Sequence, residues 1–170
     1  MKTFNFLLIG LVSLLAICCN IRQKDSVNSK FRGLWKLDKF EAYDSIGGKW
    51  VDDFTRVGYS GYILYDGQGH MAVHLMPKGY NDFDPGKNPD SLNCEEVKLL
   101  AKIYKSNYVY FASYKTENGK IKHTKLSATN PKDRGSVAIR EFEFNSDTLI
   151  LKPMEKINGL KLRLRWIKLK

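Results

Sequence analysis

The C-terminal stretch of the chain alternates between apolar and charged side chains. The apolar positions are Leu160, Leu162, Leu164 and Trp166, and the positions between them are Lys161, Arg163, Arg165 and Ile167. Because successive side chains of a strand point to opposite faces, this spacing puts the apolar residues on one face and a mainly basic row on the other. The pattern predicts a half-buried β-strand over residues 160–169.

A tight turn predicts the best-defined hairpin of the chain. Residues 108–116 and 121–129 are separated by a tetrapeptide with Asn118-Gly119 at its centre. Asn-Gly supplies the two positive φ angles of a type I′ turn, whose twist matches that of paired strands. We therefore expect the two segments to pair as an antiparallel hairpin with Tyr114 opposite His123.

The same combination of alternation and turn residues gives eight strands in all. They cover residues 33–43, 60–66, 69–76, 108–116, 121–129, 137–145, 147–153 and 160–169. Eight antiparallel strands joined mostly by hairpins predict an all-β fold, an up-and-down barrel that at this strand number can enclose one small ligand. The interruption between the third and fourth strands holds a Pro-rich loop and a helical pattern over residues 92–106, which we expect to cap the barrel mouth.

The N-terminus has a different pattern. Lys2 precedes an apolar run over residues 6–17, which fits a secretory signal better than a spanning helix, since a spanning helix needs about 20 residues. The run ends in Leu15-Ala16-Ile17-Cys18-Cys19, which resembles the lipobox of bacterial lipoproteins. That resemblance implies lipidation of Cys18 or Cys19, and an ordinary secretory signal that happens to contain cysteines is the alternative.

The chain thus divides into three expected segments. Residues 1–19 form the signal peptide and lipobox, residues 20–32 are polar and form a flexible tether, and residues 33–170 form the barrel. We expect an exported protein of the cell envelope, lipid-anchored to a bacterial membrane on its periplasmic or surface side. We expect it to be monomeric.

Composition narrows the classes of function. The 170 residues carry a formal net charge of +10 and three cysteines, too few for a disulfide framework or a Cys-rich zinc site. Many of the basic residues alternate with leucines along strands, so we expect a solvated outer face and no nucleic-acid partner. His70 and His74 lie four residues apart on a strand, about 13 Å, which is too far to share one metal ion. We expect no metal and no cofactor.

Several separate blocks of sequence carry a family likeness. They are Gly33-Leu34-Trp35-Lys36-Leu37, Gly61-Tyr62-Ile63-Leu64-Tyr65, Asp66-Gly67-Gln68-Gly69-His70-Met71, and further along Tyr110, Tyr114, His123, Pro131, Gly135, Arg140, Leu149, Leu151 and Trp166. In order and spacing these blocks resemble lipocalin-like domain proteins over residues 33–169. The resemblance implies a lipocalin-like barrel with a central cavity, and it implies no shared activity.

The polar and aromatic residues of the strands suggest where a ligand would bind. Directly opposed residues share one face of a sheet with their Cβ atoms about 5 Å apart, so Tyr114 and His123 share a face with Tyr108 and Tyr110. Such a set would line a cavity with aromatic walls and a few polar tips. The candidate ligand-binding residues are Trp35, Tyr62, Tyr108, Tyr110, Tyr114, His123, Arg140 and Trp166. The alternative is that the tyrosines belong to the core or the outer face and that His123 only completes a hydrogen bond.

Arg140 shares a strand face with Phe142 and Phe144. A guanidinium on an apolar face needs a partner, which is either a protein carboxylate or the acidic head of a ligand. If Arg140 lies in the lumen, it could hold a carboxylate or phosphate while the aromatic residues contact the hydrophobic body of the ligand.

The sequence holds no signature of a nucleophile elbow, a phosphate loop or a dinucleotide fold, and we identify no catalytic residue. The leading hypothesis is therefore an envelope lipoprotein that binds a small hydrophobic or amphipathic molecule. One alternative is an isomerase or cyclase in which Tyr114 and His123 exchange a proton. Another is a structural or partner-binding lipoprotein whose barrel is filled with side chains.

Overall fold

The computed structural model of the chain describes residues 27–82, 86 and 88–170. Within this part the strands are β1 (Gly33–Asp44), β2 (Lys49–Asp52), β3 (Ser60–Tyr65), β4 (His70–Met76), β5 (Tyr108–Glu117), β6 (Lys120–Ala128), β7 (Val137–Asn145), β8 (Thr148–Pro153) and β9 (Leu162–Lys168). The helix α2 (Cys94–Ser106) lies between β4 and β5, and short 3-10 turns follow β2 (Phe54–Arg56), precede α2 (Pro89–Ser91) and follow β6 (Pro131–Asp133).

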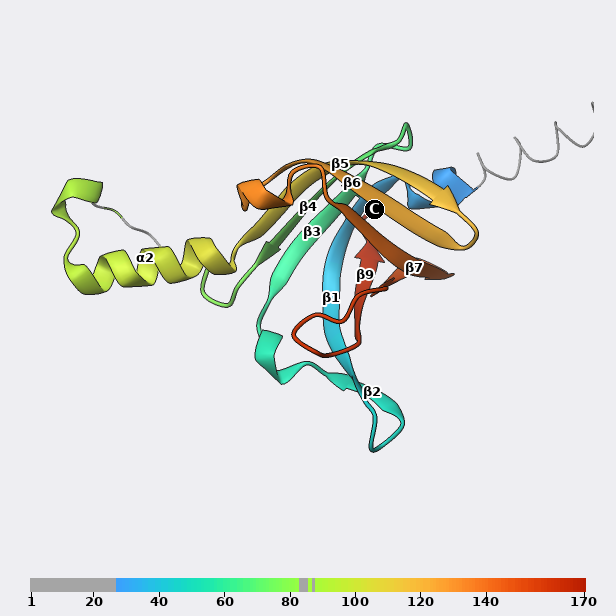
Figure 1. The fold of residues 1–170 in the computed structure, drawn as a ribbon, viewed down its shortest axis with the longest axis horizontal. Helices are drawn as coiled ribbons and strands as arrows, with labels where there is room; N and C mark the ends of the chain where they lie inside the picture. Colours follow the sequence, from blue (N-terminus) through green and yellow to red (C-terminus); the bar gives the residue numbers. More distant parts are fainter. Residues whose placement is uncertain (1–26, 83–85, 87) are drawn as a thin grey trace, which may run out of the picture.

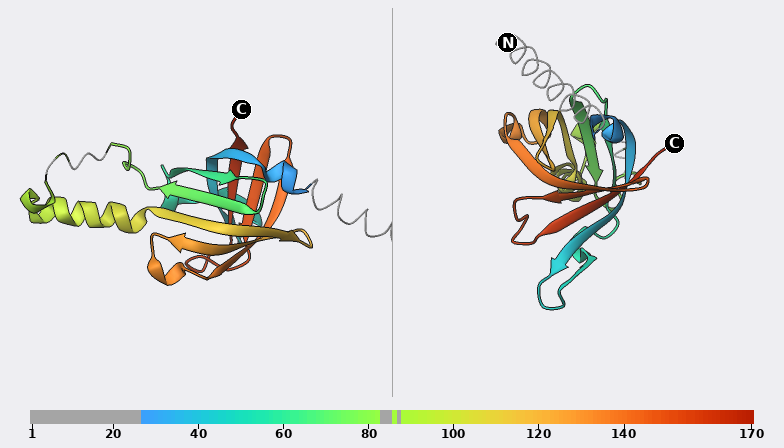
Figure 2. Two further views of the ribbon diagram at one scale, coloured as in Figure 1. Left: turned by 90° about the horizontal axis from the view of Figure 1, so that it is seen from above. Right: turned by 90° about the vertical axis from the view of Figure 1, so that its right-hand side faces the viewer.

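The strands form a closed antiparallel barrel (Figures 1 and 2). Each strand from β3 to β8 pairs with the next, β1 pairs with β3, and pairing of β1 with β9 closes the ring, so eight strands make the barrel wall. This confirms the predicted all-β antiparallel barrel. Closure satisfies the edges that an open sheet would leave unpaired.

The strand that the sequence pattern missed is β2. Its four residues pair with the far end of β1, Tyr43 opposite Trp50, and make a hairpin that extends beyond the ring (Figure 1). A run this short carries too few residues for alternation to be recognised.

The hairpin predicted at Asn118-Gly119 occurs in its expected register. Asn118 and Gly119 have φ angles of 50° and 70°, as a type I′ turn requires, and Tyr114 lies opposite His123. At the β7–β8 hairpin, Phe142 lies opposite Leu151. These turns fix which side chains face the barrel interior, because a shift of one residue would turn every side chain of a strand to the other face.

The helix α2 begins and ends close to the predicted positions but does not cap the barrel. Asn93 forms a capping box with Glu96 at its start. None of the helical residues is buried, and α2 projects away from the barrel as an arm (Figure 1). The strands before and after this segment are neighbours, since Leu75 of β4 pairs with Tyr108 of β5. The chain therefore leaves the barrel and returns to it at the same end. The prediction that the helix covers the mouth is therefore wrong.

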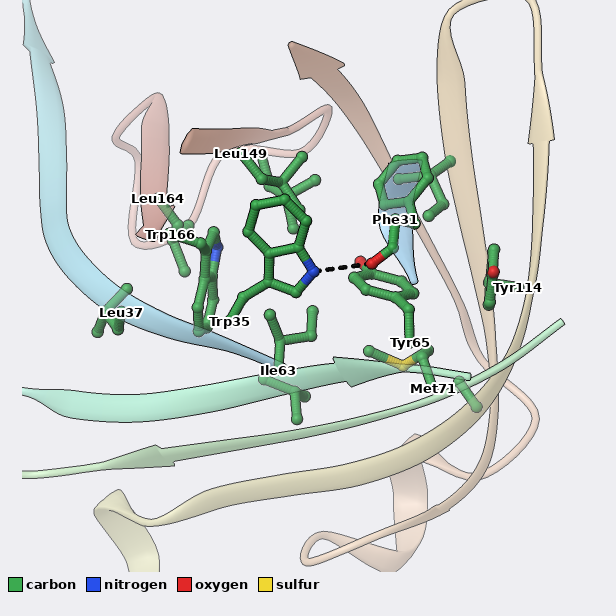
Figure 3. Close-up of a cluster of buried hydrophobic side chains, with 14 of the residues drawn as sticks. Phe31, Trp35, Leu37, Ile63, Tyr65, Met71, Tyr114, Leu149, Leu164 and Trp166 are labelled. Atoms are coloured by element: carbon green, nitrogen blue, oxygen red, sulfur yellow. Dashed lines mark hydrogen bonds between the residues drawn. The ribbon is translucent and has the colours of Figure 1, made fainter. Parts of the chain in front are cut away.

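The chain enters the barrel through a helical segment that was expected to be tether. Residues 27–31 are helical, and Phe31 is completely buried, with its ring 5.0 Å from that of Phe142 and 4.8 Å from that of Phe144. The Trp35 indole nitrogen donates a hydrogen bond of 2.8 Å to the Phe31 carbonyl (Figure 3). The segment expected to be a flexible tether is helical over its residues 27–31 and packs against the barrel end. Residues 20–26 lie outside the described residues, as do the signal peptide and both Cys18 and Cys19.

One half of the barrel interior is packed solid. Its side chains come from several strands and from the entering segment, and they include Phe31, Trp35, Ile63, Tyr65, Tyr114, Leu149 and Trp166 (Figure 3). We call this set the aromatic plug. It closes the end of the barrel where the described chain begins. We call the opposite end, from which the β1–β2 hairpin and α2 extend, the mouth.

No helix within the described ranges is long and apolar enough to cross a membrane.

Candidate functional site

A cavity of about 360 Å³ occupies the mouth half of the barrel. Its apolar wall is made by Phe40 of β1, Tyr59 ahead of β3, Leu75 of β4, and Leu162 and Leu164 of β9. We call it the mouth cavity. Its volume falls within the range typical of small-molecule sites, toward the lower end.

The β7 strand shows how the cavity and the plug share one interior. Its inward face presents Ala138, Arg140 and Phe142 in turn, since side chains two residues apart point to the same face. Ala138 and Arg140 line the mouth cavity, whereas Phe142 packs on Phe31. Arg140 therefore stands at the inner end of the cavity, where the apolar plug begins.

Three of the four charged residues of the lining are cationic. The cations are Arg56, Lys125 and Arg140, the fourth charged residue is Glu155, and Ser106 and Tyr108 add hydroxyl groups. The Arg56 guanidinium forms an ion pair with the buried carboxylate of Asp53. The Lys125 ammonium lies 3.2 Å from the Asp133 carboxylate and 5.6 Å from the centre of the Tyr108 ring. Burial by itself lowers the pKa of Lys125, but its hydrogen bonds with Tyr108 and Asp133 raise that pKa above its usual value, so the group stays charged.

Arg140 differs from the other two cations. Its Nη1 atom is buried and has no hydrogen-bond partner, and no ion pair within the described residues includes Arg140. A buried guanidinium nitrogen without an acceptor is costly, because it has lost its hydration and gained nothing in exchange. Of the two partners expected for this residue, the protein carboxylate is absent among the residues that the structure describes.

His123 lies one step deeper than Lys125 on the inward face of β6 and is completely buried. Its Nε2 lies 3.1 Å from the Tyr65 hydroxyl and its Nδ1 lies 2.9 Å from the Tyr110 hydroxyl. Burial, followed by the charges of Arg140 and Lys125, holds the pKa of His123 well below its usual value. The imidazole is therefore neutral, with one ring nitrogen donating a hydrogen bond and the other accepting one.

The candidate residues fall into four groups in the structure. Tyr108 and Arg140 line the mouth cavity. Tyr110 and His123 form the buried hydrogen-bonded layer beneath it. Trp35, Tyr114 and Trp166 belong to the aromatic plug, are at most 4% exposed, and are not among the residues that line the mouth cavity. Tyr62 faces outward and is 40% exposed, because Ile63 and Tyr65 are the inward residues of β3.

Two of these placements correct the sequence interpretation. Tyr62 does not line the lumen. Tyr114 lies opposite His123 as predicted, but its hydroxyl makes no hydrogen bond with His123, whose two ring nitrogens bond to Tyr65 and Tyr110. The enzyme alternative therefore lacks the hydrogen bond along which Tyr114 and His123 would exchange a proton.

Several lining residues were not predicted. Lys125 could have been found, because it lies two residues from His123 and thus on the same face of β6. Arg56 and Tyr59 could not, because they precede β3 in an irregular segment whose position depends on the tertiary fold. Phe40 follows an irregularity in the pairing of β1 with β9 between Leu37 and Lys39, which shifts the alternation of β1.

The remaining candidate groups have ordinary partners. His70 bonds to Asp66 at 2.9 Å, and His74 bonds to Asn107 at 2.7 Å. Cys94 is exposed at the start of α2. A search of the described residues for three or more His, Cys, Asp or Glu side chains able to hold one metal ion finds none.

The solved structures to which the chain is similar include two distant likenesses. Fatty-acid-binding protein 1 of Echinococcus granulosus is 20% identical, with a TM-score of 0.38, and the match covers 84% of this chain and 99% of that chain. A variant of the fluorescent protein UnaG is 12% identical, with a TM-score of 0.39, over 84% of this chain and 98% of that chain. At these identities and scores neither match bears on what the barrel binds.

The comparison with protein families is more specific. No curated protein matches the chain. The model of the lipocalin-like domain, however, matches residues 32–165, which is most of the chain and nearly all of the barrel. This confirms the resemblance seen in the separate sequence blocks. The chain belongs to the lipocalin-like domain family.

Proposed function

We propose that this protein binds one small amphipathic molecule in the mouth cavity. The observation that carries the proposal is the cavity itself, about 360 Å³ in volume, with a wall of aliphatic and aromatic side chains and a few convergent polar groups. Sites for small molecules have this composition, since apolar walls supply binding free energy and a few polar groups fix orientation. The aromatic plug limits the ligand to the mouth half of the barrel.

A cavity-filling substitution tests this proposal. Ala138 is buried and lines the cavity, so Ala138→Trp should occupy the space of the ligand and weaken binding at least about tenfold. The measurement is displacement of a fluorescent fatty acid, supported by native mass spectrometry for a bound species of a few hundred daltons. Ala72 on the outer face of β4 provides the matched control, because Ala72→Trp makes the same chemical change away from the cavity. Equal binding by the two variants would show that the ligand does not enter the mouth cavity.

We further propose that the protein is exported and lipid-anchored in the cell envelope. The support is the sequence of residues 1–19, with its basic start, apolar run and the pair Cys18-Cys19. The described chain begins at the plugged end of the barrel, so an anchor there would leave the mouth free for a ligand.

Metabolic labelling with radioactive palmitate tests the anchor. The native protein should incorporate label and partition with membranes, and the double variant Cys18→Ala, Cys19→Ala should lose both properties. Cys94→Ala is the control, because Cys94 lies on the exposed helix α2 and should not affect labelling. Full labelling of the double variant would rule out this anchor.

A further inference from the structure

We infer that the ligand is a monoanionic amphiphile whose carboxylate binds the Arg140 guanidinium at the inner end of the mouth cavity, with its apolar body directed toward the mouth. This inference rests on the proposed function and adds the chemistry of the head group and the orientation of the molecule.

The first argument is the balance of charge in the cavity lining. Three cations and one carboxylate line the cavity. Arg56 is paired with Asp53, and Lys125 is paired with Asp133. Arg140 has no paired carboxylate within the described residues, and Glu155, the acid of the lining, is exposed and makes no ion pair with it. One positive charge of the cavity is therefore left without a partner.

The second argument is the state of the guanidinium itself. A guanidinium presents five N–H donors in a planar fork and does not lose its proton, so it cannot escape burial by becoming neutral. Its buried Nη1 nevertheless has no acceptor. The two oxygens of a carboxylate match the fork, and charge-assisted bonds of this kind are stronger than bonds between neutral groups. A neutral hydroxyl or amide head would leave the charge unbalanced.

The third argument concerns the orientation of the ligand. Along β7 the inward residues run from Ala138 near the mouth to Arg140 and then to Phe142 in the plug. The head group cannot go deeper than Arg140, because the plug fills the interior beyond it (Figure 3). Leu162, Leu164 and the other apolar lining residues then lie beside the body of the ligand.

The number of charges favours a carboxylate over a phosphate monoester. One unpaired guanidinium balances one negative charge. A dianionic head would carry a second charge into a space whose other two cations already have carboxylate partners. Desolvating that second charge without a partner would oppose binding.

The experiment compares two probes that differ only in the head group. Decanoate and decanol are titrated into the full chain by calorimetry, at a pH where decanoate is ionised. The native protein should bind decanoate more tightly than decanol, by roughly 10- to 100-fold, as expected for a charge-assisted pair. Arg140→Met, which keeps a flexible apolar stem, should lose that preference while its affinity for decanol stays within about twofold.

Two further variants separate the head-group contact from general effects. Arg165→Met removes one positive charge from the outer face, where Arg165 pairs with Asp38 at 3.4 Å, and should leave the preference for decanoate unchanged. Arg140→Lys keeps the charge but loses the planar fork, so its preference should be intermediate. This variant also keeps the test decisive if Arg140→Met does not fold.

The outcomes distinguish this inference from the proposed function. If the native protein binds decanol as tightly as decanoate, or if Arg140→Met retains the preference, the head-group inference is overturned while a ligand-binding cavity stands. If the native protein binds neither probe, the proposed function fails as well. If Arg140→Met loses the preference for decanoate over decanol while Arg165→Met keeps it, the inference is supported.

Discussion

Trp35→Ala is expected to lower the free energy of unfolding by about 3–5 kcal/mol, as truncation of a buried tryptophan commonly does. Trp35 is 1% exposed and lies at the centre of the aromatic plug (Figure 3). Its ring packs against that of Phe144. Its indole nitrogen also donates a hydrogen bond to the Phe31 carbonyl, which holds the helical segment 27–31 against the barrel end. The substitution therefore opens a large void and releases the segment that closes the plug.

Thermal denaturation measures this effect. For a domain of about this size, each kcal/mol corresponds to roughly 2–4 °C, so Trp35→Ala should lower the Tm by roughly 6–20 °C. Trp50→Ala is the matched control. Trp50 lies on the β1–β2 hairpin outside the ring and contacts the Arg163 guanidinium at 4.8 Å, so its loss should cost about 1 kcal/mol. A Tm for Trp35→Ala no lower than that for Trp50→Ala would contradict the packed plug.

The barrel could be predicted because local features of the sequence determine the register of its strands. Asn118-Gly119 fixes one hairpin, and the alternation of apolar and polar residues fixes which face of each strand is buried. Once the strands pair in chain order, closure follows from their number. The pattern of β9 is the clearest example, since its predicted apolar row supplies Leu162, Leu164 and Trp166 to the interior.

The division of the interior into plug and cavity was not predictable from alternation. The period-2 pattern shows that Trp166 and Leu164 share a face, but it does not show that one is buried in the plug and the other lines a cavity. That distinction depends on Phe31, which enters from outside the barrel sequence and fills one end. Val27 and Phe31 are four residues apart in a polar segment, and two apolar residues are too few to establish a helical period.

Arg140 was identified from its apolar strand face, but its partner was not. The sequence left open whether a protein carboxylate or a ligand satisfies the guanidinium. Only the folded structure shows that Asp53 and Asp133 are paired with other cations. Pairing between side chains distant in sequence is a tertiary property. The sequence could therefore indicate which types of residue form the candidate site, but it could not indicate which cation lacks a carboxylate partner.

His123 and Tyr110 form a hydrogen-bonded layer beneath the mouth cavity, and His123 joins this layer to Tyr65 of the aromatic plug. All three side chains are buried, and the two hydrogen bonds to His123 satisfy both ring nitrogens. Such a layer is stable only while the imidazole is neutral, since a second ring proton would require both hydroxyls to accept hydrogen bonds beside the charges of Arg140 and Lys125.

Acid should therefore destabilise the protein through His123. The pKa of the unfolded histidine is about 6.5, and burial followed by the charges of Arg140 and Lys125 holds the folded-state pKa well below that value. Above pH 6.5 the His123 imidazole is neutral in both the folded and the unfolded protein, so its protonation takes nothing from the free energy of unfolding. As the pH falls below 6.5, the unfolded chain takes up a proton that the folded protein does not, so the free energy of unfolding decreases by about 1.4 kcal/mol for each pH unit until the folded-state pKa is reached.

Urea denaturation between pH 7.5 and 5 measures this slope. The variant His123→Phe should be less stable than the native protein at pH 7.5, because the hydroxyls of Tyr65 and Tyr110 lose their partner. Since the variant lacks the titrating imidazole, its free energy of unfolding should change little between pH 6.5 and 5. His70→Phe is the matched control, since His70 is exposed on β4 and its loss should leave the native slope intact. The same slope in the native protein and in His123→Phe would mean that another group titrates. A difference between the two slopes of about 1.4 kcal/mol per pH unit corresponds to the uptake of one proton. That difference would identify His123 as the buried group through which acid destabilises the protein.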